Sequence, residues 1–203
     1  MFSGIVETIG RVKQLYFKND CLNLCIYPHH ILSDLKIGDS IAINGVCLTI
    51  TALSDNNFYV TVVPETLRKT NLKNLSIKSR VNLERSIKIT DRIHGHFVQG
   101  HIDSVGEIIE IIQDSIDAFL IKIKIPPSLQ RYIVKKGYIS LDGMSITIIE
   151  SLEDWLSITL IPHTKEITIA DGYRVGSLIN IEVDILGKYI EKIFMEHNHA
   201  SIS

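Results

Sequence analysis

Residues 44–49 read NGVCLT and residues 142–147 read DGMSIT, so one short frame occurs twice, 98 positions apart. Each copy has an amide or acid, a glycine, a hydrophobic residue, Cys or Ser, an aliphatic residue and Thr. The same shift aligns two more pairs of blocks, VPETL (63–67) with IPHTK (161–165), and SRVNLE (79–84) with SLINIE (177–182). A constant shift over separate blocks is typical of an internal repeat. We therefore predict that the chain is a tandem duplication.

A fourth pair of blocks places the boundary between the two halves. With a slightly smaller shift, GIVETIG (4–10) aligns with GHIDSVG (100–106), each with a glycine, an acid and a second glycine. We therefore expect the chain to divide into an N-terminal half, a C-terminal half and a tail, at residues 1–96, 97–186 and 187–203.

Both halves have the pattern of β structure. Short alternating runs rich in Ile, Val and Thr recur, namely SIAINGVCLTITAL (40–53), FYVTVV (58–63), YISLDGMSITII (138–149) and LSITLI (156–161). Alternation of this kind is typical of strands, and Gly, Asn and Asp interrupt the runs at short intervals. Five or six short strands in each half suit a small closed or Greek-key barrel. The predicted fold class is all-β, with one barrel for each half.

The NG and DG pairs are candidates for hairpin turns, because Gly and Asn tolerate positive φ at little cost. Cys47 and Thr49 follow the first turn, and Ser145 and Thr147 follow the second. Residues two apart in a strand point to the same face. We therefore expect these four polar side chains to form two edges that could face a ligand.

The tail has a different period. Leu186, Tyr189, Ile190, Ile193 and Phe194 recur at helical spacing, with charged residues between them. This pattern predicts an amphipathic helix. Its apolar face could pack on the barrels of the same chain or on copies of itself in an oligomer, and the pattern alone favours neither.

Composition excludes several classes of protein. The 203 residues carry a net charge of −2 and an isoelectric point near 6.4, which gives no basic field for a nucleic acid. Phosphate-binding glycine loops and dinucleotide fingerprints are absent. The start MFSGIVETIG is unlike a signal segment, and no apolar run approaches the roughly 20 residues that cross a membrane. With three cysteines in no metal-like pairing, we expect a reducing cytoplasm and no membrane association.

Three histidines lie close together in RIHGHFVQGHID (92–103), namely His94, His96 and His101. A zinc site is the sharpest hypothesis, but no cysteine lies near to complete one, so we expect no metal. His101 falls inside the repeated Gly-x-x-acid block, which favours a place in a binding site. His94 is better interpreted as part of a connector between the halves.

Two further residues have competing interpretations. Cys47 could be a nucleophile, but its counterpart is Ser145 and neither has an evident His–acid relay in the sequence, so a ligand-lining role is favoured. Asp184 departs from the repeat, since its counterpart is Ser86. It precedes the tail helix and could cap it, or it could serve a role that differs between the halves.

Together these motifs resemble riboflavin synthase of the alpha-chain type. The resemblance rests on MFSGIVE (1–7), NGVCLT, ETLRKTNL (65–72), GHFVQGHID (95–103), DGMSIT and INIEVD (179–184), which keep the family's order and spacing. It implies two six-stranded Greek-key barrels followed by a C-terminal helix that joins subunits into a homotrimer. It also implies conversion of two molecules of 6,7-dimethyl-8-ribityllumazine into riboflavin and 5-amino-6-ribitylaminouracil, by transfer of a four-carbon unit and without cofactor or metal. An association with lumazine synthase is a further expectation.

The resemblance implies two lumazine pockets, one for each barrel. For the N-terminal barrel it assigns substrate contacts to Gly4, Ile5, Val6, Cys47, Leu48, Thr49, Val63, Pro64, Glu65, Thr66, Leu67 and Arg68, with Phe2 and Ser40 as neighbours. For the C-terminal barrel it assigns them to Gly100, His101, Ile102, Lys136, Ser145, Ile146, Thr147, Leu160, Ile161, Pro162, His163, Thr164 and Lys165. In the family the reacting pair lies between the N-terminal barrel of one subunit and the C-terminal barrel of its neighbour, and Lys136 would reach ligand on the adjacent subunit.

The chemistry implied by the resemblance needs a proton removed from the 7-methyl group of one lumazine and activation of the ring of the other. We expect His101, Ser145, Thr147 and Cys47 to supply or orient these steps, with Asp184 assisting. The sequence does not distinguish donor from acceptor barrel. It departs from the family at His94, where a glycine is usual, and at Lys165, where an aliphatic residue is common.

Two other classes of protein compete with this interpretation. A non-catalytic lumazine or flavin carrier would typically keep one good site and lose the motifs of the other half, whereas both halves here retain them. A structural or adaptor protein made of two barrels would have no reason to keep polar strand residues at matched positions in both halves.

Overall fold

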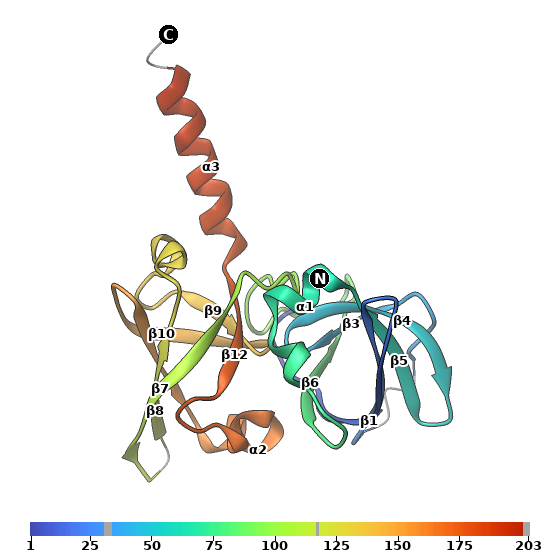
Figure 1. Cartoon of the computed structure of the whole chain (residues 1–203). Helices are drawn as coiled ribbons and strands as arrows, with labels where there is room; N and C mark the ends of the chain where they lie inside the picture. Colours follow the sequence, from blue (N-terminus) through green and yellow to red (C-terminus); the bar gives the residue numbers. More distant parts are fainter. Residues whose placement is uncertain (31–33, 117, 201–203) are drawn as a thin grey trace.

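The computed structural model describes residues 1–30, 34–116 and 118–200, with the side chains of 197–200 outside that description. Within these residues the chain forms two closed six-stranded antiparallel barrels, side by side, and a C-terminal helix that stands away from them (Figure 1). The predicted all-β fold with a terminal helix is therefore confirmed. Residues 201–203 of the predicted tail lie outside the described residues.

The N-terminal barrel contains strands β1 to β6. Their bounds are Thr8–Lys18, Cys21–Pro28, Ser40–Ile43, Val46–Ser54, Asn57–Val62 and Arg80–Arg85. Around the barrel the order is β1-β2-β5-β4-β3-β6, in which β3 lies beside β6 instead of β2, as in a Greek key. Helix α1 (Pro64–Lys69) and the 3-10 turn η1 (Asn71–Asn74) connect β5 to β6.

The C-terminal barrel repeats this plan. Its strands β7 to β12 are Ser104–Ser115, Ala118–Lys124, Tyr138–Leu141, Met144–Leu152, Trp155–Leu160 and Leu178–Val183. The strand order is again that of the first barrel, with each strand replaced by its counterpart. Helix α2 (Pro162–Ile167) and the 3-10 turn η3 (Ile169–Gly172) occupy the places of α1 and η1, and a further 3-10 turn, η2 (Pro127–Tyr132), precedes β9.

Each barrel has its own apolar core. Inward-facing aliphatic side chains such as Leu24, Ile41 and Leu83 fill the first barrel, and Ile123, Leu141 and Ile181 fill the second. On β2 the core residues Leu22 and Leu24 alternate with less buried ones, as the period-2 pattern predicts. On β12 the residues between the core positions, Asn180 and Glu182, are buried as well. Closure of each sheet leaves no unpaired edge between the six strands.

The NG and DG pairs form the predicted hairpin turns. Asn44 and Gly45 have φ of 46° and 75°, and Asp142 and Gly143 have φ of 45° and 83°. The two turns also meet, because a Cβ on Gly45 would lie 2.6 Å from the backbone nitrogen of Gly143. Glycine is therefore needed here for its positive φ and for the close approach of the two barrels.

Hydrogen bonds between the barrels repeat in both directions. Asn82 Nδ2 donates to the carbonyl of Asp142, and Asn180 Nδ2 donates to the carbonyl of Asn44, both at 2.9 Å. Asn82 and Asn180 are almost fully buried, so each amide needs these partners. The reciprocal bonds fix the barrels to each other around the meeting turns.

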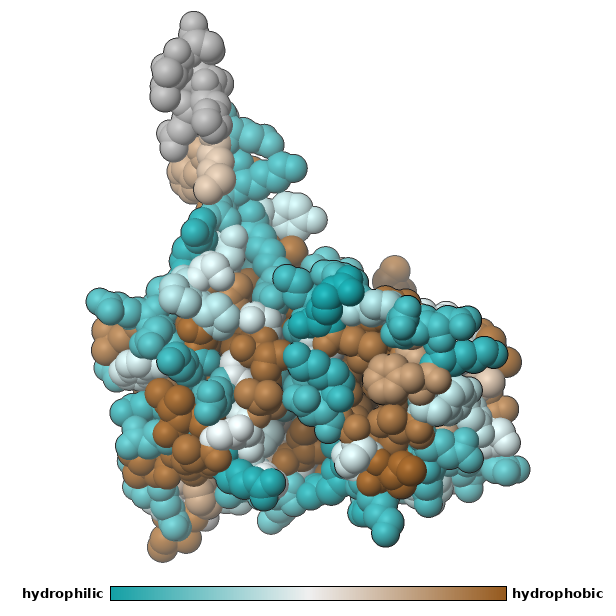
Figure 2. All heavy atoms as spheres, viewed as in Figure 1, coloured by the Kyte–Doolittle hydropathy of each residue, from teal (hydrophilic) through white to brown (hydrophobic). Residues whose placement is uncertain are grey.

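Helix α3 (Ile185–Ala200) projects from the second barrel (Figure 1). Its first turns are tied to that barrel by Lys188 with Asp103 and by Arg131 with Glu191, both at 2.6 Å. The apolar residues of the predicted stripe stay more than half exposed, namely Leu186, Tyr189, Ile190, Ile193 and Phe194. Packing of this stripe on the chain's own barrels, one of the two alternatives, is therefore wrong. In Figure 2 other hydrophobic side chains gather on the body below the helix. Among the described residues, no helix is long and apolar enough to span a membrane.

Candidate functional site

A pocket of about 400 Å³ opens beside Cys47 on the N-terminal barrel. Strand β4, helix α1 and the chain at 100–103 surround it. Its lining residues are Val46, Cys47, Glu65, Thr66, Lys69, Thr70, Gly100, His101, Ile102 and Asp103. We call this pocket the Cys47 half-site.

One wall of the Cys47 half-site comes from the segment that leads into the other barrel. The amide of Cys47 donates to the carbonyl of Gly100 at 2.9 Å, and Ile102 packs against the core of the N-terminal barrel. Gly100 has φ of +80°, and a Cβ there would lie 2.6 Å from the Cβ of Cys47. Only glycine allows this contact between the segment and β4.

The N-terminal segment makes the reciprocal contact with the C-terminal barrel. The amide of Ser145 donates to the carbonyl of Gly4 at 2.7 Å, and Val6 belongs to the C-terminal core. Gly4 has φ of +76°, and a Cβ there would lie 2.6 Å from the Cβ of Ser145. We call the residues Gly4–Val6, Ser145–Thr147 and helix α2 the Ser145 half-site.

The predicted grouping of these segments is therefore wrong. Gly4–Val6 were grouped with Cys47, and Gly100–Ile102 with Ser145, but each segment lies on the opposite barrel. The reason is that a repeat shows which segments correspond to each other but not on which barrel each segment docks. A segment could dock on the barrel of its own half or cross to the other barrel, and the repeat fits both arrangements equally well. The crossing makes each half-site a joint product of both halves of the chain.

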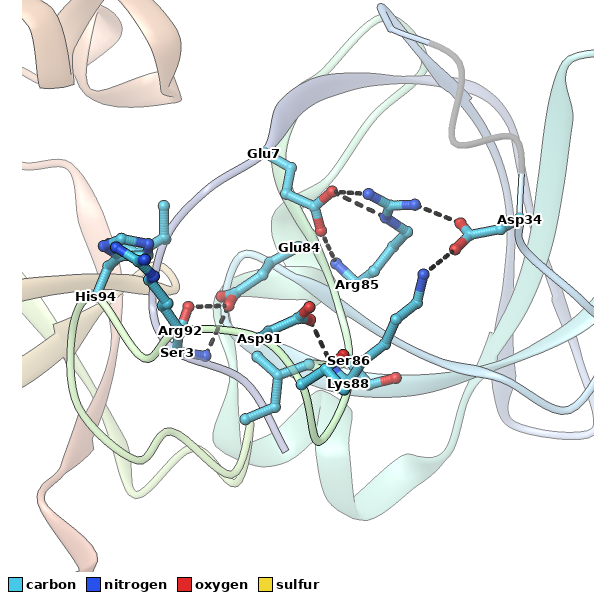
Figure 3. A pocket seen from close by; sticks show the side chains of 13 residues that line it. Ser3, Glu7, Asp34, Glu84, Arg85, Ser86, Lys88, Asp91, Arg92 and His94 are labelled. Atoms are coloured by element: carbon cyan, nitrogen blue, oxygen red, sulfur yellow. Dashed lines mark hydrogen bonds and ion pairs between the residues drawn. The ribbon is translucent and has the colours of Figure 1, made fainter.

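Two buried carboxylates hold the crossed segments in place. Glu84, at the end of β6, accepts the amides of Ser3 and Gly4 and the Ser3 hydroxyl at 2.7 to 3.2 Å (Figure 3). Its counterpart Glu182, on β12, accepts the amides of Gln99, Gly100 and His101 at 2.7 to 3.1 Å. In the sequence these two glutamates are the matched last residues of SRVNLE and SLINIE, and no site role was predicted for them.

Burial raises the pKa of Glu84 to about 7, and the hydrogen bonds from Ser3 and Gly4 offset only part of this effect. Burial also raises the pKa of Glu182. A raised carboxyl pKa means that the folded chain binds more protons than the unfolded chain between the two pKa values. Protonation of Glu84 therefore stabilises the fold below pH 4.5, and this stabilisation is lost as the pH rises through 7.

We expect Glu84→Gln to remove this dependence on pH. From pH 4.5 to 7 the free energy of unfolding of the wild type should fall more steeply than that of the variant, by up to about 3 kcal/mol. Denaturant unfolding at a series of pH values measures the difference. Glu166→Gln, an exposed change on α2, should follow the wild type. Parallel curves for wild type and Glu84→Gln would contradict the assignment.

An ion-pair network supports the β6 end that carries Glu84. Arg85 binds Glu7 and Asp34, and Lys88 also binds Asp34 (Figure 3). Hydrogen bonds from Lys88 and Arg85 lower the pKa of Asp34 to about 2. The cavity of about 500 Å³ at this place is lined by these paired charges, and its chemistry is that of a structural network.

The polar strand residues face outward as predicted. Cys47 is partly buried and Thr49 is exposed, while Leu48 between them is 6% exposed and points into the core. Ser145 is partly buried and Thr147 is exposed. Leu48 can therefore meet a ligand only through its backbone.

The other predicted residues of the N-terminal pocket lie around or behind it. Phe2 is fully buried in a cluster with Ala42 and Val98, against which Cys47 packs. Ser40 pairs with Thr49 across β3 and β4. Val63 and Pro64 begin α1, Leu67 packs against the core, and Arg68 forms an exposed ion pair with Glu65 at 2.6 Å.

Residues predicted for the C-terminal pocket are placed along β11 and α2. Leu160 is buried at the end of β11, Ile161 caps α2, and Pro162, His163, Thr164 and Lys165 form its first turns. Lys165 Nζ lies 3.3 Å from the ring centroid of Phe119, which accounts locally for this departure from the family pattern. Ile146 packs against the core, and Lys136 is exposed.

The three clustered histidines separate in space. His101 lines the Cys47 half-site, and His94 lines the cavity of the ion-pair network and does not have a positive φ, so no backbone strain arises there. His96 Nδ1 lies 2.7 Å from Ser145 Oγ in the other half-site. Over the described part of the chain, no three His, Cys, Asp or Glu residues are placed to hold a metal ion.

His96 is a site residue to which sequence analysis assigned no role. The residue is 7% exposed, and its ring stacks on Tyr138 at 5.4 Å between centroids. Burial lowers the pKa of His96, and the charge of Asp184 opposes this effect. Asp184 also caps α3, since its Oδ1 accepts the amide of Leu186 at 3.0 Å, so the predicted cap is confirmed.

Comparison with known proteins identifies the class to which this arrangement belongs. Residues 3–86 and 99–184 each match the Lumazine binding domain family. The fold also resembles that of LumP complexed with riboflavin, with a TM-score of 0.83, 26% identity, and coverage of 90% of this chain and 99% of that one. LumP complexed with 6,7-dimethyl-8-(1'-D-ribityl) lumazine gives a TM-score of 0.81.

Relatives of higher identity define the family more narrowly. The chain is 44% identical to the riboflavin synthase of Schizosaccharomyces pombe, over 97% of this chain and 95% of that protein. It is 42% identical to that of Bacillus subtilis, over 98% and 92%, and 41% identical to that of Actinobacillus pleuropneumoniae, over 97% and 91%. The chain belongs to the riboflavin synthase family.

Proposed function

We propose that this chain catalyses the dismutation of two molecules of 6,7-dimethyl-8-ribityllumazine to riboflavin and 5-amino-6-ribitylaminouracil. The observation that carries the proposal is the pair of crossed half-sites. A reaction between two identical molecules needs two similar pockets, and the duplicated barrels offer Cys47 in one and Ser145 in the other. Holding two reactants in register can contribute up to ~7–11 kcal/mol, without a cofactor or metal.

The proposed assembly is a homotrimer in which the Cys47 half-site of one subunit faces the Ser145 half-site of its neighbour. The exposed apolar stripe of α3 supports it, because five large apolar side chains on a projecting helix need a partner surface. Exposed Lys136 is then free to reach ligand on the adjacent subunit. A cytoplasmic location and an association with lumazine synthase belong to the same proposal and rest on the family resemblance.

The proposed substrate contacts are the residues assigned from the resemblance, regrouped by the crossing. Cys47, Thr66 and His101 would contact one lumazine, and Ser145, Thr147 and the start of α2 the other. Support for this regrouping is that Cys47, Thr66 and His101 line one pocket, while Gly4 lies against Ser145 on the other barrel.

The test is a mixture of purified protein and 6,7-dimethyl-8-ribityllumazine without metal or cofactor. We expect the absorbance and fluorescence of riboflavin to grow, with two lumazines consumed for each riboflavin formed. Ser145→Ala and Cys47→Ala should each slow this growth, because each removes a polar group from a different half-site. Tight binding with an unchanged lumazine spectrum would point to a carrier, and absence of binding would exclude both functions.

A further inference from the structure

The two half-sites differ in one feature that the duplication does not explain. Ser145 Oγ has an imidazole partner, His96 Nδ1, at 2.7 Å. Cys47 has no imidazole bonded to its Sγ among the contacts of the described residues, and the side chain of His101 is exposed. His96 lies in the linker between the barrels, four residues before Gly100.

The ring of His96 is held firmly against Ser145. Its backbone amide donates to the carbonyl of Ser3 at 3.2 Å, which attaches it to the segment that builds this half-site. Tyr138 on β9 stacks on the ring with an angle of 8° between the planes. The preceding Gly95 makes the approach possible, because a Cβ there would lie 2.1 Å from the Ser3 carbonyl oxygen and 2.8 Å from Ser145 Oγ.

The surroundings of the ring suit transfer of a proton. Burial favours the neutral imidazole, which has one bare nitrogen able to accept a hydrogen bond. Asp184, after β12, contributes a charge that favours the imidazolium once a proton arrives. Among the described residues, the ring is thus stacked on Tyr138, bonded to the Ser145 hydroxyl and influenced by the charge of Asp184.

We propose that Ser145 and His96 form a proton relay, and that the Ser145 half-site therefore holds the lumazine that loses its 7-methyl proton. The Ser145 hydroxyl donates to Nδ1, which directs the Oγ lone pairs to the ligand. As the C–H bond of the methyl group breaks, Oγ takes its proton, the former hydroxyl proton passes to Nδ1, and the electron pair stays on the ligand and is delocalised into its ring. The imidazolium later returns the proton. His96 acts through Ser145 and is a positioning residue. The assignment rests on the proposed function.

The test compares two replacements of His96. His96→Phe keeps a planar ring against Tyr138 and removes Nδ1, whereas His96→Asn places an amide near the position of Nδ1. We expect His96→Phe to lower kcat by about 10- to 100-fold with little change in KM, and His96→Asn to recover part of the loss. His94→Asn, at the exposed histidine two residues away, is the matched control and should keep full activity. Thermal unfolding of each variant checks that the fold is intact.

A double-mutant cycle separates a relay from a structural role. In a Ser145→Ala background, His96→Phe should change kcat by less than about twofold, because the partner through which it acts is already gone. Equal losses in both backgrounds, or a loss confined to stability, would overturn the relay.

A second readout does not need complete turnover. The 7-methyl protons of bound lumazine should exchange with deuterated solvent faster than they do without protein, and NMR measures this rate. The rate should be lower in His96→Phe than in the wild type. Exchange with no riboflavin formed would refute the proposed function and leave the relay standing. An exchange rate unaffected by His96→Phe, or no exchange above the protein-free rate, would refute the relay.

Discussion

Replacing Gly4 with alanine should empty the Ser145 half-site and leave the Cys47 half-site able to bind, although Gly4 lies in the N-terminal half of the chain. The new Cβ would need to occupy space 2.6 Å from the Cβ of Ser145 and 2.9 Å from its backbone nitrogen, at a φ of +76°. Backbone cannot give way as the end of a flexible side chain can, so the segment must leave β10. Gly100→Ala should have the reverse effect, because its Cβ would meet Cys47.

Titration calorimetry and thiol labelling distinguish the two sites. We expect two lumazines per chain for the wild type and one for each variant, with turnover reduced about 100-fold or more because positioning of the pair is lost. Ligand should still protect Cys47 from alkylation in Gly4→Ala and should fail to do so in Gly100→Ala. Gly176→Ala is the control for backbone strain alone, since φ is +87° and a Cβ would meet nothing within 4 Å. Loss of Cys47 protection in Gly4→Ala would contradict the crossing.

Placing a charge in the apolar stripe of α3 should separate the subunits. Ile190 is 54% exposed in the single chain, so Ile190→Glu costs little in the isolated fold. In a trimer the same carboxylate would be buried against apolar neighbours without a partner, which is strongly unfavourable. We expect sedimentation of a monomer and a fall in turnover of about 1000-fold or more, because the facing half-sites separate.

Lys192→Glu is the matched control for the helix. It lies on the exposed polar side of α3 and changes the charge by more than Ile190→Glu does. It should remain a trimer with near-normal turnover. A monomeric wild type with full activity, or an Ile190→Glu trimer, would exclude the helix as the device that joins subunits.

The fold could be predicted from the sequence because each half carries the same local signals for strands and turns. Asn44-Gly45 and Asp142-Gly143 predict tight hairpins wherever they occur, since their positive φ is a property of those residues. The same holds for the helical spacing in the tail. The helical spacing does not say which surface covers the apolar stripe of that helix. In the described chain the stripe stays exposed.

The crossing and the His96 contact could not be predicted for the same physical reason. Both depend on which barrel a segment docks on, and the duplicated halves present nearly equal surfaces to Gly4 and Gly100. His96 stood in a cluster of three histidines with no periodic or motif signal to single it out. Its role depends on Ser145, 49 residues away, and on a glycine at position 95 that lets the backbone approach. Glu84 and Glu182 were visible only as one acid repeated at the end of two hydrophobic strands.

The competing carrier function is testable on structural grounds. LumP shares the fold and is 26% identical, while the riboflavin synthases named above are 41 to 44% identical over nearly the whole chain. Both half-sites here keep their glycine, their buried glutamate and their polar strand residues. A carrier needs only one such site, so retention of two favours a reaction between two bound molecules.

The central claim is that one reaction centre forms from two crossed half-sites on neighbouring chains, and mixing two inactive variants tests it most directly. Gly4→Ala retains the Cys47 half-site and Gly100→Ala retains the Ser145 half-site. After unfolding and refolding together in equal amounts, about a quarter of all the interfaces should combine both intact half-sites, since each mixed trimer has one such interface among its three. We predict recovery of about a quarter of wild-type riboflavin formation, which neither variant shows alone. No recovery in trimers shown to be mixed would contradict the claim and place the reacting pair within a single chain.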